Sequence, residues 1–236
     1  ADIFPPFIRQ EGQQLTGPWI QSFAWLTQAQ GMGVHFHPIE QPQLLQQVQS
    51  QPGSCGLGVA YSAGASETVR YVGRIAPITL SLYARRHTMP HIDQLADLHG
   101  YRIAAVNEAE LVRRLDQAGL NYQTVEYRDG RGMTLLMSGQ VDVLISDLSP
   151  SRLALAGGER AFVRLATLLQ VERWLVCNTV MPVPALNRLR SALREGMFAS
   201  ETAPFWARAG LQDYYRQVRA LWMEGPPTTV RLAVHP

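Results

Sequence analysis

The two cysteines are the first residues of this chain whose chemistry can be read from their surroundings. Cys55 lies in the stretch GSCGLGVA and Cys177 in RWLVCNT, and each stretch is a short apolar run typical of a β-strand. If the two strands are neighbours, the thiols would be able to form a disulfide, which would place the protein in an oxidising compartment. The alternative is a pair of reduced, buried cysteines that pack as small hydrophobic residues. The sequence leaves both states open.

Other residues with catalytic or metal-binding chemistry are scattered. His35 and His37 lie two apart in VHFHP and would point to one face of a strand, but no third metal ligand lies near them. No stretch has the lysine of a phosphate-binding loop, and no serine stands in a nucleophile elbow. Glu126, Asp129 and Asp142 form no recognisable acid–base pair. We therefore predict a protein that is not an enzyme and binds neither a cofactor nor a metal.

The composition indicates a globular chain without a nucleic-acid surface. The 236 residues are 46% hydrophobic and 17% charged, which is too apolar for a disordered chain and sufficient for two lobes of about 100 residues each. All 21 basic residues are arginines, scattered among 19 acidic residues, so no basic stripe is formed. No run of about 18 or more apolar residues predicts a membrane span. A start at Ala1 without a signal peptide fits a cytosolic protein or a processed, exported one.

Strand-like and helix-like segments alternate along the chain and must position any site. Apolar residues at helical spacing predict helices over residues 17–31, 42–50, 108–119, 132–140, 149–158 and 184–198, with two more within 201–222. Short apolar runs predict strands over residues 34–39, 55–60, 78–86, 101–106, 123–127, 141–147 and 173–179. This alternation indicates an α/β fold with two largely parallel sheets in succession.

Three motifs in this order resemble a known family. The chain opens on DIFPPFIRQEGQQLTG, which is similar to a family opening with a Pro-Pro-Phe turn and a short hairpin. QLADLHGYRIAAV follows the predicted crossing strand, and SGQVDVLISD spans Ser138 to Asp147. Together they resemble the type 2 periplasmic binding proteins, specifically solute-binding protein family 3, which serves amino-acid importers. The similarity runs from Asp2 to about Trp222.

The resemblance implies an α/β fold of two lobes. Each lobe would be a mostly parallel sheet flanked by helices, and two crossing strands would form the hinge. Lobe 1 would comprise residues 1–84 and 174–236, including C-terminal helices and a terminal strand at 230–234. Lobe 2 would comprise residues 85–173. A ligand would bind in the cleft between the lobes, outside the carboxyl ends of the strands.

The same resemblance gives roles to residues at the strand ends. Phe7 would pack on the ligand, or else belong to the core. Tyr61 and Ser62 would hold the ligand's amino group through backbone carbonyls and a hydroxyl, although Ser62 could instead stabilise a turn. The Asp147 carboxylate would pair with a ligand ammonium, or else cap the following helix. In a separate loop, Arg128 could reach an anionic group of the ligand, or else be solvated.

Two departures from the family pattern bear on the ligand. Amino-acid binders have an arginine after the third strand that grips the α-carboxylate, and Ala65 stands at that position. Arg70 or Arg74 could substitute, or could form surface charges or structural ion pairs. The family's Gly-Thr turn is replaced by VNEAEL, where Asn107 could cap a helix and Glu108 would repel an anion. We therefore expect a cationic, peptide-like or modified ligand, or none.

The last residues, TTVRLAVHP, alternate as a half-buried strand would. Members of the family begin with such a strand directly before the Pro-Pro-Phe turn, whereas this chain begins at the turn. We expect residues 230–234 to complete the sheet of lobe 1, either within the chain or through residues 230–236 in a strand-exchanged dimer. The alternative is that these residues begin a second binding module.

These observations predict a periplasmic, monomeric solute-binding protein that delivers a small polar ligand to the membrane permease of an ABC importer. The ligand would be amino-acid-like, but not an ordinary free α-amino acid, and no nucleic acid would bind. One alternative is an extracytoplasmic ligand-sensing domain of a signalling protein. Another is a dehydratase-like enzyme on the same fold, in which Glu108 would be the general acid. A cytosolic effector-binding domain is disfavoured, because no DNA-binding helix pair precedes the lobes.

Overall fold

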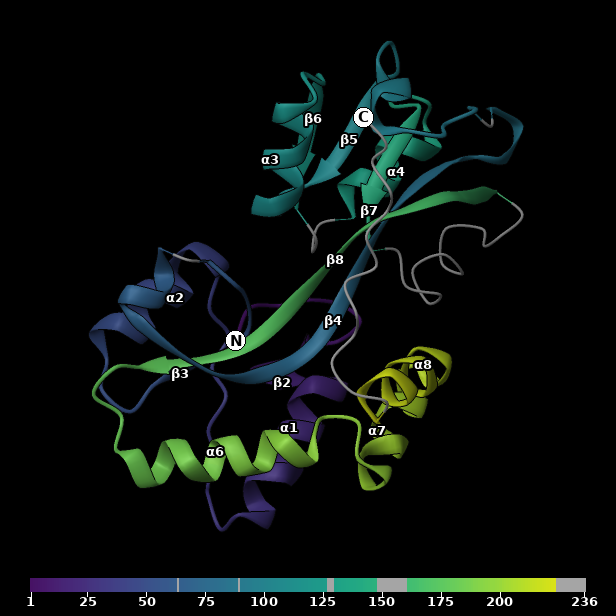
Figure 1. Cartoon of the computed structure of the whole chain (residues 1–236). Coiled ribbons are helices and arrows are strands. Elements are labelled where there is room, and N and C mark those ends of the chain that lie inside the picture. The colour runs from purple at the N-terminus through teal and green to yellow at the C-terminus, as the bar shows by residue number, and fades with distance from the viewer. Residues whose placement is uncertain (63, 89, 127–129, 148–160, 224–236) are drawn as a thin grey trace. The chain divides into compact units, whose positions relative to one another are not determined.

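The protein forms two compact units, shown in Figure 1. The structure, a computed structural model, describes residues 1–62, 64–88, 90–126, 130–147 and 161–223. Within these ranges, unit 1 comprises residues 1–78 and 171–223, and unit 2 comprises the described part of residues 79–170. The lobe limits that the sequence predicts stay a prediction. The predicted helix at 149–158 and the predicted strand at 230–234 lie outside the described residues.

Two long strands contribute residues to both units. These strands are β4 (Val69–Arg85) and β8 (Phe162–Asn178), each 17 residues long. The sequence predicted only the parts at 78–86 and 173–179, and within β4 the unpredicted part contains Gly73 and Pro77, residue types that usually interrupt strands. They belong to a six-stranded sheet whose hydrogen-bonded order is β3-β8-β4-β7-β5-β6.

Unit 1 combines a hairpin, several helices and the antiparallel pair of β3 with the end of β8. Its further elements are β1 (Arg9–Glu11), β2 (Gln14–Thr16), α1 (Pro18–Ala29), α2 (Gln41–Ser50), β3 (Cys55–Ala60), η1 (Ala65–Glu67), α6 (Val183–Glu195), η5 (Ser200–Thr202), α7 (Ala203–Arg208) and α8 (Gln212–Met223). For lobe 1 the sequence predicted mostly parallel strands. The described strands β3 and β8 of unit 1 instead pair antiparallel. None of the described helices is long and apolar enough to cross a lipid bilayer.

The first helix shows how sequence spacing becomes packing in unit 1. Pro18 occupies the first turn of α1, where its missing N–H costs no hydrogen bond. Trp19, Ile20, Phe23 and Leu26 lie on one face at helical spacing and are all buried. This apolar face stabilises the helix against the rest of unit 1.

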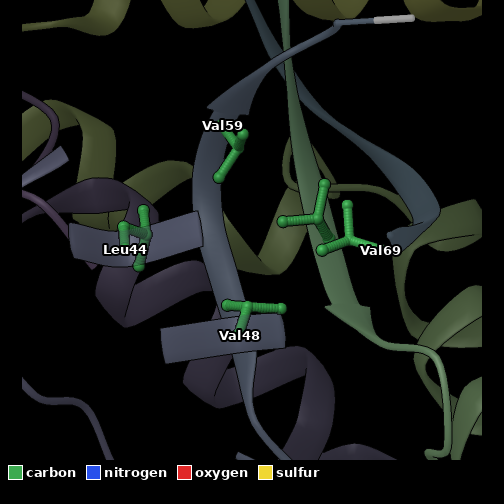
Figure 2. Packing of buried hydrophobic residues seen from close by; sticks show 5 residues of the cluster. Leu44, Val48, Val59 and Val69 are labelled. Carbon is green, nitrogen blue, oxygen red and sulfur yellow. The ribbon is translucent and has the colours of Figure 1, made fainter. Parts of the chain in front are cut away.

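A small apolar cluster joins α2 to the sheet of unit 1. Leu44 and Val48 from α2 meet Val59 from β3 and Val69 from the start of β4, as Figure 2 shows. Val176 of β8 completes the cluster. Each of these side chains is no more than 3% exposed, so each contributes about 1.5–3 kcal/mol of hydrophobic burial.

The segment at 34–39 is not the strand that its alternation predicted. Residues 34–39 have no regular secondary structure. The amino group of Ala1 instead donates to the His37 carbonyl at 2.8 Å, and the Ile39 N–H donates to the Ala1 carbonyl at 3.1 Å. Alternation alone is insufficient for a strand, because the backbone must also find a partner strand.

Unit 2 contains a three-stranded parallel sheet extended by the end of β4. Its elements are η2 (Arg86–Thr88), η3 (Leu95–Leu98), β5 (Ile103–Val106), α3 (Ala109–Gln117), β6 (Tyr122–Val125), α4 (Arg131–Met137) and β7 (Val143–Ser146), with the start of β8. β5 pairs in parallel with both β6 and β7. β7 also pairs antiparallel with β4. Helix α3 packs on β5, and α4 packs on β5 and β7 (Figure 1).

Of the two cysteine states that the sequence left open, the structure contains the disulfide. The sulfur atoms of Cys55 and Cys177 are joined at 1.99 Å, and the two residues face each other across the β3–β8 pair. The bond links positions 122 residues apart in the sequence. It therefore ties the N-terminal half of unit 1 to the chain that returns from unit 2.

Removing this cross-link is expected to destabilise unit 1. Because the bond closes a 122-residue loop, the double variant C55A/C177A should lose up to about 5 kcal/mol of unfolding free energy. Thermal and urea unfolding with and without a reductant would measure the loss. The reductant should lower the melting temperature of the wild type and leave that of the double variant unchanged. A wild type that is insensitive to full reduction would contradict this prediction.

Gly17 should tolerate substitution far less well than Gly12. Both have positive φ, 108° and 63°, but a Cβ at Gly17 would lie 2.5 Å from the Phe7 carbonyl oxygen, whereas nothing lies within 4 Å at Gly12. Gly17→Ala should therefore cost more than about 2 kcal/mol, and Gly12→Ala about 1 kcal/mol. Urea unfolding of both variants would compare the two losses. Equal losses would show that the contact with Phe7 is unimportant.

Candidate functional site

The carboxyl ends of the three parallel strands of unit 2 lie at one edge of its sheet. Val106 of β5 lies opposite Val125 of β6, and Ala105 lies opposite Ile145 of β7. The residues that follow these strands are Asn107, Glu126 and Asp147. Because the register is in step, these three residues stand in a row at the edge where open α/β sheets bind ligands. This row includes two of the site residues predicted from the sequence.

Asn107 lies at the centre of the row and bonds to its neighbour after β6. Its backbone N–H donates to the Val125 carbonyl at 3.0 Å, and its side-chain amide donates to the Glu126 carboxylate at 3.3 Å. The prediction that Asn107 caps the following helix is wrong, because Glu108 occupies the N-cap of α3. Asn107 therefore orients the Glu126 carboxylate at the exposed rim of the edge.

Glu108 is a buried carboxylate at the start of α3. The residue is 5% exposed, and its carbonyl accepts the first helical hydrogen bond, from Val112, at 2.9 Å. Its side chain makes no hydrogen bond to the helix N-terminus. In contrast, Glu110 in the first turn binds Arg113 and Arg114, and their guanidinium groups lower the pKa of Glu110. Glu108 is therefore buried at the start of α3, whereas Glu110 forms ion pairs with two arginines of the same helix.

Asp147 completes the row after β7 and is 7% exposed. The Ser146 hydroxyl donates to its carboxylate at 3.4 Å, and Ser146 pairs with Ser81 of β4. The pKa of Tyr83 is raised, mainly by burial. A hydrogen bond with Ser81 and the charge of Arg164 lower this pKa, whereas the charge of the Asp147 carboxylate raises it. The hydroxyl groups of Ser146, Ser81 and Tyr83, together with the charge of Arg164, thus contribute to the surroundings of Asp147. The sequence also allowed Asp147 to cap the following helix, but the residues of that predicted helix lie outside the described part of the chain.

Of three other lobe 2 candidates, the structure describes only Asp142. Arg128 and Asp129 lie outside the described residues. Asp142 precedes β7, at the opposite edge of the sheet, and its carboxylate accepts from Arg102 at 2.6 and 3.0 Å. The hydrogen bond with Arg102 is the main reason why the pKa of Asp142 is lowered. Asp142 therefore has a structural role in unit 2.

In unit 1, Phe7 is a core residue. It is 3% exposed, and its ring stacks on Trp19 with the centroids 4.9 Å apart. Phe4 and Tyr214 also contact the ring, with centroid distances of 5.7 and 5.2 Å. Of the two roles that the sequence left open for Phe7, this burial fits the core role.

Tyr61 and Ser62 follow β3 and lie beside two other aromatic residues of unit 1. The side chain of Tyr61 is 59% exposed and its ring centroid lies 5.0 Å from that of Tyr71 and 6.4 Å from that of Trp174. The Tyr71 hydroxyl accepts from the Ser62 N–H at 3.0 Å and donates to the Ala60 carbonyl at 3.2 Å. Burial raises the pKa of Tyr71. Tyr71 thus fixes the backbone that carries both predicted ligand contacts.

The arginines that could replace the missing carboxylate clamp make other contacts in unit 1. Arg70 donates to the Thr179 carbonyl at 2.9 Å, and Arg74 lies 3.9 Å from the carboxylate of Glu172. Ala65, at the family's arginine position, belongs to η1 and packs against the apolar cluster. His35 and His37 are exposed, and the described residues hold no group of three metal-ligating side chains.

Comparisons with known proteins identify the architecture. A histidine kinase sensor domain similar to periplasmic binding proteins matches with a TM-score of 0.68 and 16% identity, over 94% of this chain and 93% of that one. A putative binding component of an ABC transporter from Wolinella succinogenes, complexed with lysine, matches with a TM-score of 0.67 and 16% identity. The match covers 95% of this chain and 96% of that one. The chain has a periplasmic-binding-protein fold. An arginine-, lysine-, histidine-binding protein from Geobacillus stearothermophilus matches with a TM-score of 0.66 and 14% identity. The match covers 88% of this chain and 92% of that one.

The periplasmic-binding-protein fold confirms the resemblance and the fold class predicted from the motifs. At 14–16% identity, these neighbours show the fold alone. No protein-family model matches the chain, and no curated protein matches it significantly. The residues of this periplasmic-binding-protein fold must therefore be interpreted from their own contacts.

The sequence reasoning missed three residues that the structure places beside the candidates. Glu126 lies inside the strand predicted at 123–127, whereas β6 ends at Val125, so the sequence placed the strand end two residues too late to select it. The rule of strand ends could not have selected Tyr71 or Trp174. Their contacts with Tyr61 bring together β4, β8 and the end of β3, which are far apart in the sequence. In this periplasmic-binding-protein fold, they become neighbours only through the tertiary structure.

Tyr71→Phe should loosen the turn after β3. The variant removes the hydroxyl that the Ser62 N–H donates to, so exchange of the Ser62 amide hydrogen should become faster. The free energy of unfolding should fall by about 1 kcal/mol. Hydrogen exchange by NMR would measure the first effect. Tyr122→Phe is a matched control, since it removes a hydroxyl bonded to Asp116 in unit 2, and it should leave Ser62 unchanged. Unchanged exchange in Tyr71→Phe would contradict this role.

Proposed function

We propose that this chain is a solute-binding protein, not an enzyme, that captures a small cationic, amino-acid-like ligand. The row of Asp147, Asn107 and Glu126, together with the buried Glu108 that follows Asn107 in the sequence, is the observation that carries the proposal. These groups stand at the strand ends where this kind of sheet binds ligands. The protein would hand its ligand to the membrane permease of an ABC importer.

The charge of the row favours a ligand with an ammonium or guanidinium group. Three carboxylates belong to this edge, and two of them, in Glu108 and Asp147, are at least 93% buried. Charges interact more strongly in such a poorly solvated place than in bulk water. A ligand cation would be attracted there, and a ligand carboxylate would be repelled.

The contacts in unit 1 favour a ligand without a free α-carboxylate. Ala65 offers no charge, and Arg70 and Arg74 already contact a carbonyl and a carboxylate of unit 1. Two structural neighbours are described as an arginine-binding protein bound to arginine and as a protein complexed with lysine. Their ligands have side chains of the proposed charge. Decarboxylated relatives of these amino acids, such as agmatine and cadaverine, are therefore our preferred ligand class.

The disulfide between Cys55 and Cys177 supports an oxidising location such as the periplasm. We propose a monomer in that compartment.

A second candidate function is ligand sensing, because a histidine kinase sensor domain is among the structural neighbours. A gene product that continues beyond residue 236 into a membrane helix and an output domain would favour sensing. A neighbouring permease and ATPase gene would favour transport.

A thermal-shift comparison of paired ligands tests the proposal. Three pairs of ligands would each be added in excess to the protein. The pairs are agmatine with arginine, cadaverine with lysine, and citrulline, whose side chain is neutral, with glutamate, whose side chain is anionic. A ligand at 100 times its dissociation constant adds about 2.7 kcal/mol of stability. We expect agmatine or cadaverine to raise the melting temperature at least as much as its amino acid. Stabilisation by glutamate alone would contradict the proposal.

Asp147→Asn should weaken binding of the preferred cation at least about 10-fold, since it removes a buried charge–charge contact worth more than about 1.4 kcal/mol. Asp213→Asn is the control, because Asp213 is an exposed carboxylate on α8 in unit 1. Titration calorimetry would compare the two variants. Equal affinities would exclude Asp147 from the site. Consumption of the ligand over hours, followed by NMR, would instead indicate an enzyme.

A further inference from the structure

Strand β3 is a buried strand at one end of its sheet. In the described residues its neighbour is β8 alone, since the sheet order is β3-β8-β4-β7-β5-β6. Leu57 and Val59 of β3 are nevertheless only 5% and 1% exposed. An antiparallel pair directs every second N–H and C=O of a strand away from its partner, and a buried backbone group without a hydrogen bond is costly. The outer edge of β3 therefore needs a further strand.

Residues 34–37 have a second unpaired backbone in unit 1. Val34 and Phe36 are partly buried and alternate with the exposed His35 and His37, as in a strand with one covered face. No backbone hydrogen bond joins residues 34–36 to another described residue. This segment therefore has the side-chain pattern of a strand but lacks a partner strand.

Both unpaired segments lie against α1 and the apolar cluster of unit 1. The ring of Phe36 lies 6.2 Å from that of Phe23 on α1. One helical turn earlier, the Trp19 ring lies so close to Gly58 of β3 that a Cβ there would be 2.7 Å from it. Ile39 packs against the apolar cluster that α2 forms with β3. The two unpaired edges therefore border one region over α1.

The hydrogen bonds of Ala1 show how a strand can lie in this region. Its amino group donates to the His37 carbonyl, and its carbonyl accepts from the Ile39 N–H. One residue that bonds to two residues two positions apart shows the pattern of a parallel pair. A strand in line with Ala1 that runs in the same direction would continue this pattern along residues 34–37.

We propose that residues 230–234 dock in this region as a strand between residues 34–37 and β3. Of the strands that the sequence predicts, this is the one that lies wholly outside the described residues. Val230, Leu232 and Val234 suit a covered face, and β-branched residues are enriched in strands. The docked strand would give both unpaired edges a partner. This inference does not rest on the proposed ligand.

The docked segment belongs to the same chain. α8 (Gln212–Met223), the last described helix, lies in unit 1 together with β3. Residues 224–229 can extend over about 20 Å, so they supply a linker between α8 and the docked strand. Docking within one chain agrees with the monomer that we propose. A strand exchanged between two copies is the alternative that the experiment must exclude.

Amide NMR of the intact, deuterated chain tests the docking. NOEs should connect the amide protons of residues 230–234 with those of residues 34–37 and of β3. Their exchange with solvent should be at least about 100-fold slower than in a free peptide of the same sequence, because a docked strand exchanges only when it opens. Light scattering should give the mass of one chain. Absent NOEs and unprotected amides would overturn the proposal, and a dimer that shows the NOEs would overturn docking within one chain.

Two matched variants test which face of the segment is covered. Leu232→Asp places a charge on the covered face and should accelerate exchange of residues 230–234 at least about 10-fold, because an uncompensated buried charge is costly. The amides of β3 should exchange faster as well. Arg231→Asp introduces the same residue on the opposite face and should leave the exchange slow. Equal exchange rates in the two variants would overturn the proposal.

Discussion

The parallel register of β5 with β6 and β7 is the constraint on which the candidate site of unit 2 depends. Backbone hydrogen bonds set Val106 opposite Val125 and Ala105 opposite Ile145. The three strands must therefore end together, and the next residue of each is polar. A shift of one register position would turn every buried side chain of a strand to the other face. The apolar core of unit 2 thus holds the carboxylate row in place.

Unit 2 separates its charges along the length of β7. Carboxylates gather where the parallel strands end, and arginines gather where β4 ends and β7 begins. The antiparallel pairing of β4 with β7 produces this arrangement, because the last residues of one strand lie beside the first residues of the other. Arg85, with its ion pair to Asp142, thus lies at the opposite end of β7 from Asp147.

Unit 1 depends on close packing around two buried rings. Phe7 and Trp19 stack on each other, and Gly17 lets the backbone before α1 approach the Phe7 carbonyl. Gly73 serves the same purpose on β4, where a Cβ would lie 2.8 Å from the side chain of Leu193 on α6. These glycines look like strand breakers or loop residues in a sequence. In the structure they permit contacts that a larger residue would prevent.

The sequence by itself indicated most of the strands and helices in the described part of the chain, because periodicity is a local property of neighbouring residues. It also placed Asn107 and Asp147 after buried strands, and so at the edge of the sheet where the candidate site lies. The tertiary structure decided what depends on distant partners. It joined Cys55 to Cys177 across 122 residues, buried Phe7, directed Asn107 to Glu126 instead of a helix cap, and left residues 34–39 without a strand partner. Such contacts follow from the path of the whole backbone, which no local pattern contains.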